Sequence, residues 1–150
     1  MMQVKSSIGN RHVELKIAES GKLTRAGIRW AFFMLGRDLQ ETANREILRK
    51  PKHGQLYIVR TPSGRKRRHR ASAWGEAHAN LTGTLRKSMG WKVRGSNELE
   101  FGYGLAKPAP DYAHNIEVTK NRPSLKLSVD ANQRNAELHF ARQIKRSFAI

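Results

Sequence analysis

The chain has 150 residues, a formal net charge of +17 and no cysteine. This length suits about one domain with a single modest core, and the lack of cysteine excludes disulfides and thiolate metal sites. So large a charge makes copies of the chain repel one another at low salt, and it favours an anionic partner such as nucleic acid, an acidic protein or an anionic membrane. No apolar run is long enough for a membrane span or a secretory signal, which predicts a soluble protein, by default of the cytosol.

A strand and a long helix are the first predicted elements. Val13, Leu15 and Ile17 alternate with more polar residues, the period of a strand with one buried face. From about residue 22 to residue 49, apolar residues recur at steps of three and four, which predicts a helix that ends before Pro51.

The apolar face of this helix is unusually wide. Trp30, Phe32, Phe33 and Met34 are almost consecutive, more than is needed to cover one side of a small sheet. Two interpretations stay open: a helix buried on two sides within the subunit, or a subunit interface formed by these four residues, since aromatic residues and Met are enriched at interfaces.

The middle of the chain combines a β-prone segment, a turn and a dense basic tract. Residues 55–60 favour a strand, and Pro62, Ser63 and Gly64 favour a turn. The tract has no acidic residue within it, so we expect a solvated loop or hairpin tip, at about residues 60–80, that contacts a partner or DNA. Its cations are Arg60, Arg65, Lys66, Arg67, Arg68 and Arg70.

The rest of the chain predicts a β-hairpin and a final helix. Two alternating segments, 91–93 and 99–103, flank the turn residues 95–97, and a helical period follows Pro123, interrupted on its apolar face by Asn132. The pattern predicts a single α+β domain over residues 1–150, in which the two helices pack on an antiparallel or mixed sheet of about four strands.

Catalytic and metal-binding patterns are weak. The six histidines are scattered without ligand spacing, and we expect His69 and His78 to be ordinary solvated residues. Asp111 and Glu117 flank His114, but no nucleophile or orienting group accompanies them, so a solvated or salt-bridged role is favoured. We therefore expect no enzymatic activity, no cofactor and no metal.

Several short segments occur in the order typical of one phage family. They comprise residues 71–77 and then Thr82, Gly83, Leu85, Arg86, Ser88, Tyr112, Ala113, Glu117, Arg122 and Pro123. With them the chain resembles the head–tail joining or tail-completion proteins of long-tailed bacteriophages, over about residues 4–150 and best from residue 71 onward. In that family a Thr-Gly-x-Leu-Arg-x-Ser helix start precedes a hairpin, a Tyr-Ala-x-x-x-Glu segment, an Arg-Pro and a final helix. One departure is that Val118, Thr119 and Lys120 follow Glu117, where the family commonly has Phe-Gly-Thr.

The resemblance implies a small virion protein without enzymatic activity. It would assemble in the host cytoplasm into a homo-oligomeric ring, a hexamer by family expectation, at the neck or the head-proximal end of the tail. Its partners would be the phage connector or stopper and tail tube proteins, with possible backbone contact to packaged DNA and no membrane.

The alternative is a basic nucleic-acid-binding protein that contacts phosphates without sequence specificity. If all six cations contacted phosphates, raising the salt concentration from about 50 to 200 mM would lower the affinity by roughly three orders of magnitude. Sequence-specific recognition is disfavoured, because no recognition-helix motif and no interleaved aromatic residues accompany the tract.

Overall fold

The computed structural model describes residues 4–8, 12–17, 25–80, 82–95, 98–113 and 115–148. These residues form an α+β domain, as predicted. Its elements in chain order are β1 (Val4–Ile8), β2 (His12–Ile17), α1 (Arg25–Leu48), β3 (Leu56–Arg60), β4 (Lys66–Arg70), α2 (Thr84–Ser88), β5 (Met89–Arg94), β6 (Glu98–Tyr103), the short π-helix η1 (Asn115–Thr119) and α3 (Ser124–Phe148).

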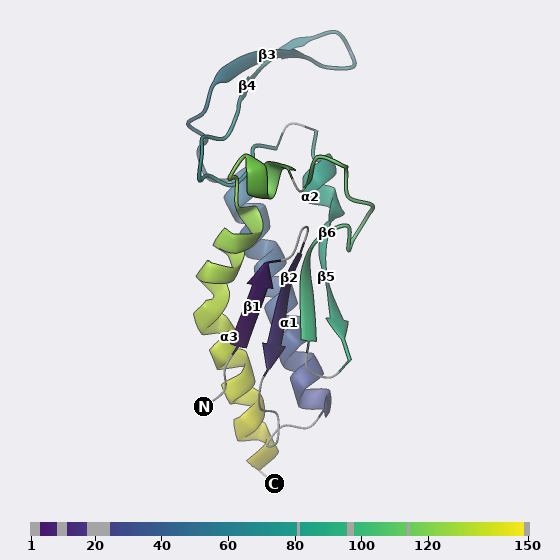
Figure 1. The fold of residues 1–150 in the computed structure, drawn as a ribbon, viewed down its shortest axis with the longest axis vertical. Helices are drawn as coiled ribbons and strands as arrows, with labels where there is room; N and C mark the ends of the chain where they lie inside the picture. Colours follow the sequence, from purple (N-terminus) through teal and green to yellow (C-terminus); the bar gives the residue numbers. More distant parts are fainter. Residues whose placement is uncertain are drawn as a thin grey trace.

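The body of the molecule has two layers. One is an antiparallel sheet in the order β1-β2-β6-β5, and the other is the pair of long helices, α1 and α3, which pack against each other and cover one face of the sheet (Figure 1). The register between β5 and β6 runs from Met89 opposite Tyr103 to Arg94 opposite Glu98. Strands β1 and β5 are therefore the two edge strands of this sheet.

Helix α1 forms the centre of the core. Ile28, Phe32, Leu35 and Leu39 recur at steps of three and four and are each at most 2% exposed. Phe32 contacts Phe140 of α3 edge to face, with ring centroids 5.2 Å apart. The prediction that Phe32 lies in a subunit interface is wrong, because its place in the helical period directs it into the core of its own subunit.

Asn132 joins the two helices. Its Nδ2 group donates to Thr42 Oγ1 of α1 at 2.8 Å and to the Ser128 carbonyl at 2.9 Å. Buried polar groups need such partners, so this interruption of the apolar face of α3 is a hydrogen bond between helices.

The strand arrangement differs from the prediction in two ways. The segment 56–60 is a strand, but it pairs with β4 in a separate two-stranded sheet and does not join the main sheet. The main sheet instead gains β1, which the sequence did not predict because its serines give no clear alternation. Part of the expected basic loop is thus strand β4.

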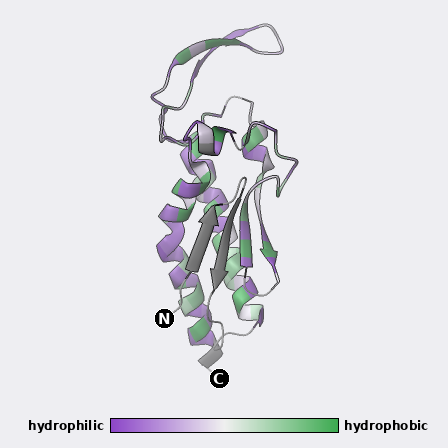
Figure 2. Cartoon of the chain, viewed as in Figure 1, coloured by the Kyte–Doolittle hydropathy of each residue, from purple (hydrophilic) through white to green (hydrophobic). Residues whose placement is uncertain are grey.

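The β3–β4 hairpin extends away from the body beyond the ends of α1 and α3 (Figure 1). Colouring by hydropathy shows hydrophobic and hydrophilic residues side by side on this hairpin, although it lies outside the core (Figure 2). The hairpin is therefore one part of the described chain where apolar and charged residues are exposed together.

Candidate functional site

The basic hairpin, residues 56–70, has a regular register. Leu56 lies opposite Arg70, Ile58 opposite Arg68, and Arg60 opposite Lys66. A short turn closes it: the Thr61 amide donates to the Arg65 carbonyl at 2.9 Å, and Gly64 has φ of 78°, a conformation that glycine adopts readily. The hairpin thus keeps its extended form up to the tip.

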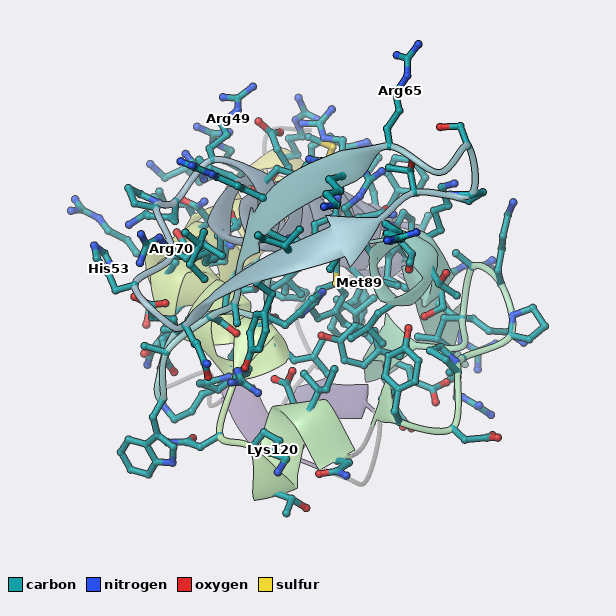
Figure 3. The ribbon with its side chains drawn as sticks, turned by 90° about the horizontal axis from the view of Figure 1, so that it is seen from above. Arg49, His53, Arg65, Arg70, Met89 and Lys120 are labelled. Atoms are coloured by element: carbon teal, nitrogen blue, oxygen red, sulfur yellow. The ribbon has the colours of Figure 1, made fainter. Side chains whose placement is uncertain are left out.

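Nearly all side chains of the basic hairpin are exposed. The six predicted cations are all exposed, and so are Leu56, Tyr57 and Ile58, with Ile58 71% exposed. Arg65 extends outward at the tip end of the hairpin, whereas Met89 lies inside the body (Figure 3). The structure therefore brings the predicted cations together on one projecting element.

Glu76 secures the base of the hairpin. Its carboxylate accepts hydrogen bonds from the Ala73 amide at 2.8 Å and the His53 amide at 3.1 Å, and it pairs with His53 Nδ1. The Ala73 amide, followed by the His53 side chain, lowers the pKa of Glu76 to about 2. Between Glu46 and Glu98 it is the sole acidic residue of the sequence, and its charge is used here.

Backbone contacts complete this base. The Gly54 amide donates to the Ala71 carbonyl at 3.1 Å, and a Cβ atom at Gly54 would lie 2.6 Å from the Ser72 carbonyl oxygen. The Arg122 guanidinium donates twice to the Ser72 carbonyl, at 3.0 and 3.2 Å. Arg122, a residue of the phage-like motif, thus ties the hairpin to the segment that precedes α3.

Glu117, another motif residue, lies inside the body. Its carboxylate accepts hydrogen bonds from the Leu125 amide at 2.7 Å, the Ser124 amide at 3.1 Å and the Tyr103 hydroxyl at 3.1 Å. Two of these donors are the first amides of α3, which have no partner within the helix. The prediction that Glu117 is solvated or in a salt bridge is wrong: it caps the N-terminus of α3 from within.

His78 belongs to the same cluster and is 4% exposed, which also corrects the expectation of a solvated residue. Its ring nitrogen Nδ1 lies 2.7 Å from Ser124 Oγ and 3.4 Å from the Tyr103 hydroxyl. Burial, with a smaller effect of Lys52, lowers the pKa of His78 to about 4. Burial raises the pKa of Glu117 to about 7 and that of Tyr103 well above its usual value.

The motif residues gather around this cluster. A mainly apolar cavity of about 340 Å³ is lined by Thr82, Gly83, Leu85 and Tyr112 of the motif, together with His78. Ser88 Oγ donates to the Leu85 carbonyl at 2.8 Å, and Ala113 is fully buried. Arg86 and Pro123 are half-buried. The motif is thus a set of packing and capping residues at the end of the body that carries the hairpin.

A second exposed surface lies at the sheet edge. Trp30, Phe33, Trp91 and Val93, flanked by Arg29 and Lys92, line an open groove of about 550 Å³ next to the edge strand β5. We call it the aromatic groove. Phe33 is 52% and Trp30 38% exposed, whereas Met34 is half-buried.

Glycine 36 explains how the groove is built. Phe33 packs edge to face on Trp91, with centroids 5.0 Å apart, and a Cβ atom at Gly36 would lie 2.4 Å from the Trp91 ring. Only glycine at this position leaves room for the Trp91 indole against α1. The sequence signal that could have revealed this contact is a glycine in the middle of a strongly helical pattern, which usually has a packing reason.

Among the described residues, no group of three or more His, Asp or Glu side chains could hold a metal ion, and no helix is long and apolar enough to cross a membrane. Asp111 is exposed and is not among the hydrogen-bond partners of Glu117. Comparisons with protein-family models, with curated proteins and with solved structures found no match.

Proposed function

We propose that this protein is a structural virion component, a head–tail joining or tail-completion subunit that forms a ring at the neck of a tailed phage. The observation that carries the proposal is the aromatic groove beside an edge strand. An edge strand presents unpaired N–H and C=O groups to a neighbour, and exposed aromatic residues favour a protein contact. Trp30 and Phe33 supply those aromatic groups at the surface.

The motif supports the same proposal from a second direction. Its residues are distant in sequence, yet Glu117, Arg122 and the lining of the 340 Å³ cavity meet at one end of the body. An ordered motif that builds one local structure is more specific than its short pieces are. The hexameric state, the virion location and the neighbouring connector, stopper and tail tube proteins follow from the resemblance.

The test is the mass of the protein in solution at about 0.5 M salt, where charges are screened within a few ångströms. We expect a discrete ring or a ring-forming equilibrium, and the Phe33→Glu variant should shift it toward the monomer by more than tenfold in dissociation constant. Leu138→Glu is the matched control, since Leu138 is 44% exposed on α3 and lies outside the groove. A strictly monomeric protein, or equal effects of the two variants, would contradict self-assembly through the groove.

A nucleic-acid-binding protein that acts as a monomer is the second candidate, and the basic hairpin favours it. It makes no use of the aromatic groove. Tight, salt-sensitive binding of a duplex by a monomer that is indifferent to Phe33→Glu would therefore favour this candidate over the ring.

A further inference from the structure

We propose that the basic hairpin inserts as a two-stranded ribbon into the major groove of duplex DNA, where its cations contact phosphates without reading the base sequence. The inference deepens the proposed function by naming the partner of the hairpin, and it rests on that function only for its setting. The binding itself is argued from the charges, the register and the shape of residues 54–76.

The side chains of the hairpin cations have no acidic partner among the described residues. None of the six forms an ion pair there, and Arg70 alone makes a side-chain hydrogen bond, to the Gly54 carbonyl at 3.2 Å. Glu76, the nearest acidic residue in the sequence, is already bound at the hairpin base. These exposed cations are therefore available to a negatively charged partner outside the subunit.

The register places cations on both faces of the ribbon. Residues directly opposite each other share a face, and successive residues alternate. Arg60, Lys66, Arg68 and Arg70 consequently share one face, Arg67 lies on the other, and Arg65 lies in the turn. A flat acidic protein surface would meet the four cations of one face, whereas a groove with phosphates along both walls would also meet Arg67.

The dimensions of the hairpin fit this groove. Two paired strands are about 4.8 Å apart, and the major groove of B-form DNA, about 12 Å wide, admits a two-stranded β-ribbon. A-form RNA offers a deep, narrow major groove that side chains do not enter.

Single-stranded nucleic acid fits less well. Binding of unpaired bases depends on aromatic side chains that stack on them; within the basic hairpin Tyr57 is the lone aromatic residue other than histidine, and exposed Trp74 lies beyond its base. The observations thus favour the B-form duplex.

The hairpin is held in position before it binds. Gly54, Glu76 and Arg122 fix its base through hydrogen bonds, and the turn between Thr61 and Arg65 fixes its tip. Preorganisation lowers the ordering cost of binding. We expect the cations to reach the phosphates without a folding step.

The test is fluorescence anisotropy with the full-length protein and a mixed-sequence duplex of about 24 base pairs, titrated between about 50 and 200 mM salt. Six phosphate contacts predict a slope of about −5 for the logarithm of the association constant against the logarithm of salt. The hairpin variant carries Arg65, Lys66, Arg67 and Arg68, each replaced by Gln. We expect its slope to fall to about −2 and its affinity at about 100 mM salt to fall by at least 30-fold.

A matched control removes the same charge elsewhere. Lys120, Arg134, Arg142 and Lys145 are exposed residues outside the hairpin, and replacing all four with Gln also lowers the net charge by four. We expect at most about a threefold loss for this control, because its cations do not face the bound duplex. Thermal unfolding of both variants monitors the fold.

Competitors separate the possible ligands. Methyl green, a major-groove ligand, should displace the protein, whereas netropsin, a minor-groove ligand, should not. Four results would each overturn the inference: no binding by the unmodified protein, equal losses in the two variants, equal affinity for an RNA duplex, or equally effective competition by polyglutamate, which would indicate an acidic protein partner.

The same samples keep the inference and the proposed function apart. Sedimentation of each variant without DNA reports self-association, which depends on the aromatic groove and not on the hairpin. Loss of duplex binding with an intact ring supports the present assignment, whereas duplex binding without any ring would contradict the virion-ring proposal and leave this one standing.

Discussion

Two regions of this molecule treat charge in opposite ways. Glu117 is buried in the body, and three donors within the same subunit satisfy its carboxylate. The basic hairpin holds six exposed cations, and within the described residues none has an acidic partner. A buried carboxyl group with its hydrogen bonds made stabilises the fold, whereas exposed cations without acidic partners are available for a binding partner. Substitutions should therefore affect stability in the first region and binding in the second.

The largest effect is expected at the buried carboxylate. Glu117→Ala leaves the Tyr103 hydroxyl and the Ser124 and Leu125 amides without their acceptor, and we expect a loss of about 3–5 kcal/mol in the free energy of unfolding. Urea unfolding followed by circular dichroism measures it. Glu137→Ala, at an exposed site on α3, is the control and should stay within about 0.5 kcal/mol. Equal effects would contradict the capping role.

The pH dependence should sharpen the contrast further. Because burial raises the pKa of Glu117 from 4.5 to about 7, its contribution is fully present below about pH 4.5 and is lost as the pH rises through about 7. The stability advantage of the unmodified protein over Glu117→Gln should therefore shrink by about 2–3 kcal/mol between about pH 5 and pH 8.

The contribution of His78 to stability changes with pH in the opposite direction. Its pKa falls from 6.5 to about 4, so its contribution is present above about pH 6.5 and is lost as the pH falls through about 4. Because His78 is present in both the unmodified protein and the Glu117→Gln variant, the difference in stability between them reports the effect of the Glu117 carboxylate. An advantage that grows as the pH rises would mean that the three donors outweigh burial at Glu117.

A moderate effect is expected where the aromatic groove meets α1. Gly36→Ala places a Cβ atom against the Trp91 ring, which costs about 1–3 kcal/mol by overpacking and exceeds the gain in helix propensity of about 1 kcal/mol. In a Trp91→Ala background the same substitution should become stabilising by up to about 1 kcal/mol. Urea unfolding of the four proteins measures this reversal. If Gly36→Ala destabilised the protein in both backgrounds, the Trp91 ring would not be the group that the added Cβ atom contacts.

The smallest effect is expected at the hairpin cations. Replacing Arg65, Lys66, Arg67 and Arg68 with Gln should change the free energy of unfolding by at most about 0.5 kcal/mol, because these side chains are exposed and form no ion pair with the described residues of the body. Thermal unfolding checks this result. A loss above about 1 kcal/mol would show that the cations stabilise the subunit, and the contrast between the two regions would not hold.

Periodicity predicted the parts of the fold that have one clear buried face. It found α1, α3, β2 and the β5–β6 hairpin, because each alternates or repeats in step with its own geometry. It missed β4, whose residues Lys66–Arg70 carry no apolar side chain. That strand is set by its pairing with β3 and by the backbone contacts at Gly54, neither of which a local pattern contains.

The candidate site was predictable to a similar extent. The exposure of the six cations agrees with what their local sequence indicated, whereas for Trp30 and Phe33 the sequence left burial within the subunit and a subunit interface both open. Glu117 and His78 were misjudged because their hydrogen-bond partners, Tyr103 for Glu117 and Ser124 for His78, lie outside the local sequence. Phe32 was misjudged because the wide apolar stretch was treated as one face, although Phe32 is in phase with Ile28, Leu35 and Leu39.

The anchoring of the hairpin has a mechanical consequence. Its first strand follows the end of α1 after a short segment in which Lys52 Nζ donates to the Glu46 carbonyl, and its return is bound by Arg122 just before α3. The hairpin is thus attached at its base to the adjoining ends of both long helices. A force applied at Thr61–Arg65 would therefore act on the end of α1 through one strand and on the start of α3 through the other.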